Sequence, residues 1–148
     1  MTKKPLTGWL ILLILILSVG SISNGGPMLI TLADSYQPHF TQFPALPRAV
    51  RAAQIVFALS IGLGVYSAWI FYRRKPGSLF LAQNCFLGTV ALRIAAGCAI
   101  PMFGGLPPAA TSQLMQGWTR SVIIALGFTI AWYLYLSRSK RVHDIYAT

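Results

Sequence analysis

Four long apolar stretches, separated by short polar segments, dominate the pattern of hydrophobic and polar positions along this chain. They cover about residues 6–33, 48–72, 79–100 and 117–136. A helix needs roughly 20 apolar residues to cross the ~30 Å hydrocarbon core of a bilayer, and each stretch is close to or above that length. We therefore predict an all-α, polytopic integral membrane protein whose residues 1–148 form one domain, a four-helix transmembrane bundle.

The first stretch contains a break, because Ser23-Asn24-Gly25-Gly26-Pro27 interrupts the apolar run. Either one helix continues to about Ala33 with a kink at Pro27, or it ends near Asn24 and Met28–Ala33 forms a separate short element. Membrane helices tolerate Pro and Gly when neighbouring helices satisfy the freed backbone groups, which favours continuation. The basic start, the apolar run and Ser21-Ile22-Ser23 also fit a secretory signal, but we expect a retained span.

The segments between the stretches read as two kinds of connection. Asp34–Pro47 and Pro101–Gln116 are rich in proline and polar residues, so we expect two external loops. Arg73-Arg74-Lys75-Pro76-Gly77 combines three cations with two helix breakers, which predicts a tight cytoplasmic turn.

Charge supports a membrane location and sets an orientation. The 148 residues are 55% apolar and 9% charged, with a net charge of +10. The basic residues flank apolar runs and do not form one face of a soluble body, so we expect no nucleic-acid partner. Basic residues favour the cytoplasmic side and bind anionic phospholipids. Both termini are therefore predicted to be cytoplasmic, and the expected lipid contacts are Arg73, Arg74, Lys75, Arg138, Lys140 and Arg141, with Lys3 and Lys4 on the same side.

Small residues mark helix faces that could pack closely. The third stretch has a row of mostly small side chains at helical spacing, formed by Asn84, Gly88, Ala91, Ala95 and Ala99. Arg93 lies on the opposite side of the same helix, so only one of these two faces can point into the bundle. Such rows let helices approach each other, which makes a second copy or another membrane subunit a candidate partner.

Three arginines within the predicted spans are the candidate binding residues. Arg51, Arg93 and Arg120 all fall toward the external side, and Arg120 shares a helix face with Gly127 and Ala131. A charge inside a span is costly and is by default a functional hypothesis. One interpretation is a cationic pocket for an anionic group, with Asp34 as the only acid on that side; the other is that each arginine reaches the phosphates or a loop carbonyl. Both remain open from the sequence.

We expect no enzyme, metal or cofactor. The only histidines and acids are His39, His143, Asp34 and Asp144, and the predicted topology puts them on two sides of the membrane in pairs. A metal site needs three or four converging ligands, and hydrolytic catalysis needs an oriented base near a nucleophile.

The two ends of the chain resemble the bacterial membrane family catalogued as domain of unknown function 2569. The resemblance rests on Gly8-Trp9-Leu10, on Trp132-Tyr133-Leu134-Tyr135, and on Ser139-Lys140-Arg141-Val142. Members have four spans and a Trp-x-Pro-Tyr pattern before a Ser-x-Arg-Val tail. Leu134 stands where the family has proline. The resemblance implies the inner membrane of a bacterium and brings no activity.

Two functions of different class follow from these observations. The first is a non-enzymatic accessory or interaction protein, built on the small-residue faces. The alternative is an oligomeric small transporter or channel-like protein, whose outer cationic pocket of Arg51, Arg93, Arg120 and Asp34 takes an anionic or amphipathic ligand.

Overall fold

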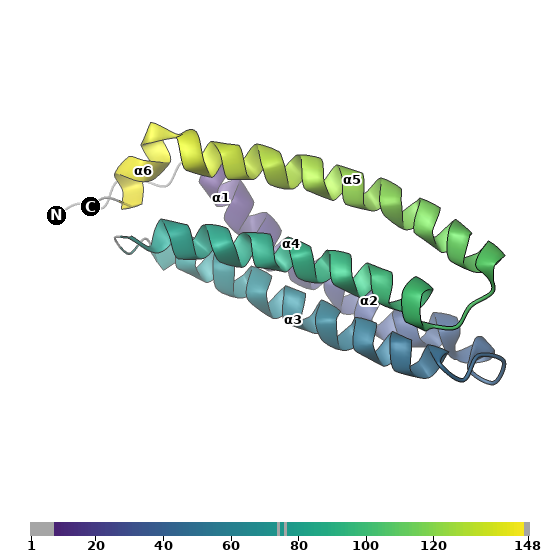
Figure 1. Cartoon of the computed structure of the whole chain (residues 1–148). Helices are drawn as coiled ribbons and strands as arrows, with labels where there is room; N and C mark the ends of the chain where they lie inside the picture. The colour runs from purple at the N-terminus through teal and green to yellow at the C-terminus, as the bar shows by residue number, and fades with distance from the viewer. Residues whose placement is uncertain (1–7, 74, 76, 147–148) are drawn as a thin grey trace.

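A computed structural model describes residues 8–73, 75 and 77–146, which form helices joined by short turns (Figure 1). Four helical runs are long and apolar enough to cross a membrane: Gly8–His39, Leu46–Arg73, Ser78–Phe103 and Pro108–Arg138. The predicted all-α class with four membrane-spanning helices is confirmed. The predicted lipid contact Arg74, together with Lys3 and Lys4, lies outside the described residues.

The first span is one continuous helical run. It consists of α1 (Gly8–Leu15), a π-helical turn at Ile16–Gly20, α2 (Ser21–Tyr36) and a short 3-10 turn at Gln37–His39. Continuation through Pro27 is thus confirmed, and an end near Asn24 is wrong. Contacts with the next helix hold this segment: a Cβ at Gly25 would meet Ile61, and Gln54 Nε2 donates a hydrogen bond to the Leu29 carbonyl at 2.8 Å.

Both predicted external loops are too long, because helix continues into them. α2 and its 3-10 turn reach His39, and α3 (Leu46–Arg73) begins soon after. α4 (Ser78–Phe103) contains Pro101 in its last turn, and α5 (Pro108–Arg138) begins nine residues before the predicted Gly117. Proline is tolerated at the first position of a helix, and residues 109–116 are mostly good helix formers. These preferences extend α5 beyond its apolar part. A search for apolar stretches does not detect this extension.

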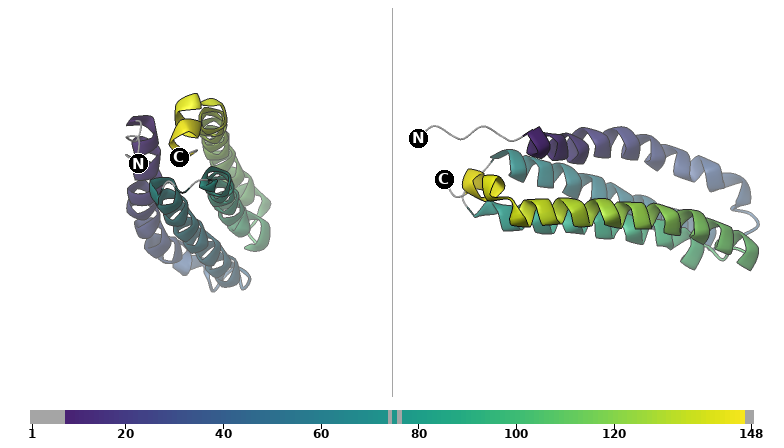
Figure 2. Two further views of the ribbon diagram at one scale, coloured as in Figure 1. Left: turned by 90° about the vertical axis from the view of Figure 1, so that its left-hand side faces the viewer. Right: turned by 90° about the horizontal axis from the view of Figure 1, so that it is seen from above.

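The four spans pack unequally. α3 and α4 make the most extensive contact, and α2 lies on α3. α5 contacts α4 far less, and its direct contact with α1 or α2 is at most slight. The end-on view in Figure 2 shows α1–α2 and α5 on opposite sides of the bundle. The fourth span is accordingly the least buried of the four.

A short helix that we did not predict closes one end of the bundle. α6 (Lys140–Tyr146) turns back at the end of the bundle where α1 begins, as Figure 1 shows, and it contacts α4 and α5. It buries Val142, Ile145 and Tyr146, and the Tyr146 hydroxyl donates a hydrogen bond to the Phe71 carbonyl at 2.7 Å. The spacing of these three side chains is helical, so the signal for this amphipathic helix was in the sequence.

The buried core is split into two clusters. The α6-end cluster holds Leu10, Leu13, Phe71, Phe86, Trp132, Leu136 and Tyr146 among its members. The loop-end cluster is formed by Leu46, Val50, Ala53, Ala99 and Ile100, with Leu32, Tyr36 and Leu114 packed against it. The region between the two clusters, at the middle of the spans, is where the candidate site lies.

The row of small residues on α4 mostly faces away from the bundle. Asn84, Ala91 and Ala95 are exposed, whereas Gly88 contacts Leu63 of α3 and Ala99 is buried. The interior face instead carries Phe86, Thr89 and Ala96, and it is the face that Arg93 shares. Arg93 therefore lies on the bundle side of α4, where its side chain is exposed to the cavities described below.

Candidate functional site

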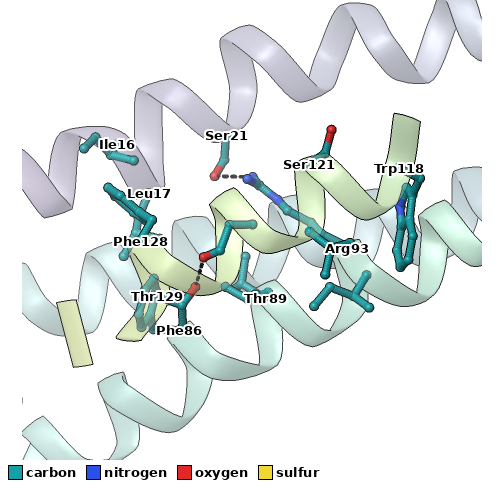
Figure 3. A pocket seen from close by; sticks show the side chains of 14 residues that line it. Ile16, Leu17, Ser21, Phe86, Thr89, Arg93, Trp118, Ser121, Phe128 and Thr129 are labelled. Carbon is teal, nitrogen blue, oxygen red and sulfur yellow. Dashed lines mark hydrogen bonds between the residues drawn. The ribbon is translucent and has the colours of Figure 1, made fainter. Parts of the chain in front are cut away.

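Arg93 lies near the middle of α4 and points into the bundle. It is the tenth residue before Phe103, about 15 Å from that end of α4 and about 22 Å from the start at Ser78. Its Nη2 donates a hydrogen bond to Ser21 Oγ of α2 at 2.9 Å (Figure 3). This cation is deeper than the sequence suggested, because α4 extends past the predicted end at Ile100.

Ser21 is held at its position by the backbone around it. It is 1% exposed and is the first residue after the π-helical turn at Ile16–Gly20, a kind of irregularity that often marks functional sites. α2 crosses α3 at Gly64, where an added Cβ would lie 3.1 Å from Ser21 Oγ and 3.4 Å from the Leu17 carbonyl. Glycine at position 64 therefore leaves the space that lets Ser21 face Arg93.

Arg93 lines two cavities that meet at its side chain. The larger cavity, of about 500 Å³, extends toward the loop-end cluster between α2, α3, α4 and α5. The smaller one, of about 200 Å³, extends toward the α6-end cluster. Arg93, Trp118 and Ser121 line both cavities. The two spaces thus form one path within the bundle, with the guanidinium at the junction.

Trp118 forms the other side of this junction. Its indole occupies the space that a Cβ at Gly97 would need, so α5 approaches α4 closely only where α4 has glycine. Figure 3 shows Ser121 and Trp118 of α5 near the Arg93 side chain, whose guanidinium points toward Ser21. Trp118 thus lies at the junction of the two cavities and lines both of them.

The guanidinium has few polar partners within the protein. Ser21 Oγ is the acceptor found for it, and among the described residues no carboxylate lies within ion-pair distance. Asp34 is exposed on α2, thirteen residues beyond Ser21, hence about 20 Å farther along the helix. A guanidinium has five N–H groups, so most of its hydrogen-bonding capacity is directed at the cavities.

The structure does not place Arg51, Arg93 and Arg120, the three arginines of the predicted cationic pocket, around one cavity. Arg120 lines a separate shallow depression formed by α5 alone, and Arg51 is exposed and lines neither cavity at Arg93. Trp118 and Arg120 are two residues apart, about 200° around a helix, so they face opposite ways. Gly127 and Ala131, which share the helix face of Arg120, are exposed as well.

Several polar residues of the site were not found from the sequence. Ser21, Ser121, Thr89 and Thr129 line the smaller cavity, and Tyr36 and Gln113 line the larger one. Serine and threonine are common in spans as partners of their own backbone, as in the bond from Thr129 Oγ1 to the Ala125 carbonyl at 2.7 Å. A serine or threonine in a span therefore does not by itself indicate a binding site. Gly97 could have been noticed, because it lies four residues after Arg93 and hence on the same helix face.

The charged and metal-ligating residues are otherwise dispersed. Within the part of the chain that the structure describes, no three His, Cys, Asp or Glu side chains gather into a group that could hold a metal ion. Arg93 is the one charged residue among those found to line the two cavities. The chemistry of the site is accordingly that of a single guanidinium with hydroxyl groups around it.

Fold and site together define a polytopic membrane protein with a lone cation inside its bundle. The sequence model of one protein family, described as "Protein of unknown function (DUF2569)", matches residues 3–147. The chain belongs to this family, as the resemblance at its two ends indicated. No match was found among curated proteins or among solved structures.

Proposed function

We propose that this protein is a non-enzymatic, membrane-embedded binding protein for a small organic anion, which it holds at Arg93 within the bundle and admits from the loop end. The single observation that carries this proposal is the position of Arg93 at the junction of two cavities, with Ser21 as its protein acceptor. This proposal is related to the second function that the sequence suggested, a small transporter with a cationic pocket. Such a transporter would bind the same kind of anion and also move it across the membrane.

The energetics favour a binding role for Arg93 over a structural one. A charged side chain near the middle of a bilayer costs at least about 2.5–3.5 kcal/mol, and such residues usually have a partner. One neutral hydroxyl compensates little of this cost, because it accepts a bond from one of the five guanidinium N–H groups and brings no opposite charge. A bound carboxylate would supply the missing partner through the two parallel hydrogen bonds that guanidinium geometry allows.

The larger cavity has the properties of a ligand pocket. Its volume of about 500 Å³ falls in the range of roughly 300–1,000 Å³ that is usual for small-molecule sites. Its walls are mainly apolar, including Leu29, Phe57 and Ile100, and its polar groups are few. An apolar pocket with one strong polar anchor favours a ligand that has an apolar body and an anionic group.

Orientation follows from the basic residues, and it directs the larger cavity outward. Arg73 ends α3, and Lys75 lies in the turn that follows it. Arg138 ends α5, and Lys140 and Arg141 begin α6. All of these residues lie at the end of the bundle where α1 begins (Figure 1). By the positive-inside rule this end is cytoplasmic, with both termini inside, in the inner membrane of a bacterium as the family resemblance implies. The same cations are the proposed contacts of anionic phospholipids.

A second candidate, an accessory protein that packs against a membrane partner, is favoured by a separate observation. Ala58 and Gly62 of α3 and Ala91 and Ala95 of α4 are small residues that face away from the bundle. A Cβ at Gly62 would meet no atom within 4 Å. A helix of a second copy or of another subunit could approach here. Gly62→Ile should then reduce chemical cross-linking between copies, or to a co-purifying subunit, while leaving anion binding unchanged.

The binding function can be tested by ligand-dependent thermal unfolding in detergent, with sodium benzoate as the probe. A ligand that binds only the folded state raises the unfolding temperature, and above its Kd the stabilisation grows with the logarithm of the ligand concentration. We expect benzoate to stabilise the wild type and Arg120→Gln, and to leave Arg93→Gln unaffected. Arg120→Gln is the matched control, since it removes a cation from the same protein outside the cavities. Equal stabilisation of Arg93→Gln, or none of the wild type, would contradict the proposal.

A further inference from the structure

A third cavity continues the path past Arg93 toward the α6 end. It has a volume of about 380 Å³ and lies between α1 and α5. It shares Ile16 and Phe128 with the smaller Arg93 cavity, so the two adjoin. We call this continuous space from Arg93 to Trp9 and Trp132 the seam. It exists because the backbone of α5 packs mainly on α4, while α5 contacts α1 near the α6 end, where the ring centroids of Trp9 and Trp132 lie 6.3 Å apart.

The polarity of the seam changes along its length. Near Arg93 it carries the hydroxyl groups of Ser21, Ser121 and Thr129. Farther along, its walls are Trp9, Leu12, Ile16, Phe128, Ala131 and Trp132, with Tyr135 as the one member that bears a hydroxyl. A ligand that fills the seam must therefore be polar at the Arg93 end and apolar over the rest.

The length of the seam matches a lipid chain. Trp9 precedes Ser21 by twelve residues, which corresponds to about 18 Å along the helix. One leaflet contributes about 15 Å of the hydrocarbon core, so the seam is about as long as one extended acyl chain. Its side walls are also accessible from the membrane, since Ile16 is 37% and Phe128 is 41% exposed.

The charge of the site restricts the polar group to a monoanion. Arg93 is the one charged residue among those that line the three cavities. A phosphate monoester carries a charge of about −1.5 to −2 at neutral pH, which one guanidinium would leave partly uncompensated inside the membrane. A carboxylate carries one charge on two oxygens and matches the paired donors of the guanidinium.

We propose that the anion held at Arg93 is the carboxylate of a single-chain amphiphile, and that its hydrocarbon chain lies in the seam with its end near Trp9 and Trp132. This inference rests on the proposed function and specifies the ligand class of the same site. The larger cavity, which extends from Arg93 toward the loop end, admits water to the carboxylate.

Quenching of tryptophan fluorescence by bromine reports where each part of the chain lies, because the seam has tryptophans at both ends. The protein is placed in nanodiscs of phosphatidylcholine and titrated with tetradecanoate that is brominated either at its last carbon or next to the carboxylate. Tetradecanoate with bromine at its last carbon should quench the tryptophan fluorescence of the wild type saturably. This saturable quenching should be absent in the double variant Trp9→Phe/Trp132→Phe. Tetradecanoate with bromine next to the carboxylate should quench the fluorescence of Trp118. This quenching should persist in the double variant.

Two further variants separate the polar from the apolar part of the site. Arg93→Gln should weaken saturable quenching by either probe roughly tenfold or more, the loss expected for a charged hydrogen bond. Ala131→Leu fills the seam beside Trp132 and should weaken binding of tetradecanoate while benzoate still stabilises the protein. Trp69, which stacks on Tyr66 outside the seam, reports the background from unbound probe.

The outcomes distinguish this inference from the proposed function. If benzoate stabilises the protein through Arg93 but chain-end bromine gives no saturable quenching of Trp9 and Trp132, the seam does not hold the chain and the inference is overturned. Chain-end quenching that survives in Trp9→Phe/Trp132→Phe overturns it as well. If benzoate does not stabilise the wild type, or stabilises Arg93→Gln equally, the proposed function itself is contradicted.

Discussion

Trp118 of α5 lies against the backbone of Gly97 on α4, so closely that its indole fills the space of a Cβ at position 97. This contact sets the distance between α4 and α5 at the level where the cavities meet. It also fixes the indole beside Arg93, four residues earlier on the same face of α4. The site therefore depends on a glycine that makes no contact of its own with a ligand.

Gly97→Ala should displace Trp118 and destabilise the bundle. Overpacking of a tight contact typically costs about 1–3 kcal/mol, and the rigid indole has little freedom to yield. Thermal unfolding in detergent measures the effect. Gly127→Ala is the control, because no atom lies within 4 Å of a Cβ there, and it should be neutral or slightly stabilising. Equal stability of Gly97→Ala and Gly127→Ala would show that the contact does not hold α5.

Arg93→Leu should leave the stability of the unliganded protein unchanged or raise it by up to about 3 kcal/mol, the cost of a cation at this depth. The reason is that Arg93 has a hydroxyl partner and, among the described residues, no ion pair to lose. The free energy of unfolding in detergent without added anion is the relevant measurement. A large loss of stability would instead reveal a structural partner for the guanidinium, since breaking a buried ion pair is strongly destabilising.

Tyr146→Phe should loosen the docking of α6. The lost hydrogen bond caps the Phe71 carbonyl in the last turn of α3, where carbonyls lack helical donors, and is worth about 1 kcal/mol. Faster amide hydrogen exchange in α6 would show the effect. Tyr133→Phe removes an exposed hydroxyl of the same type and should leave exchange in α6 as it is in the wild type.

Orientation can be checked with single cysteines in a background of Cys85→Ala and Cys98→Ala. Gln42 lies in the turn before α3, and Lys140 begins α6 at the opposite end of the bundle. We expect a membrane-impermeant maleimide to label Gln42→Cys in intact cells, and Lys140→Cys only after the membrane is opened. The reverse pattern would place the larger cavity on the cytoplasmic side.

The sequence alone determined the class of protein and the number of spans. Apolar length and the absence of charge are local properties, and a bilayer selects helices by these properties irrespective of their neighbours. The end residues Trp132, Tyr135, Ser139, Arg141 and Val142 likewise indicated the family. Helix ends were predicted less well, because α5 and the 3-10 turn at Gln37–His39 continue through polar and proline-containing segments that carry no hydrophobic signal.

Only the tertiary structure decided which face of each helix points inward, and with it the site. Within the membrane, apolar side chains face lipid as readily as protein, so a row of small residues does not reveal the interior; the row on α4 is mostly exposed. Arg93 was one of the three arginines identified from the sequence as candidate binding residues, but Ser21, Gly97 and Trp118 were not identified as part of the site. They belong to three different helices, and they meet because α2 crosses α3 at Gly64 and α5 approaches α4 at Gly97.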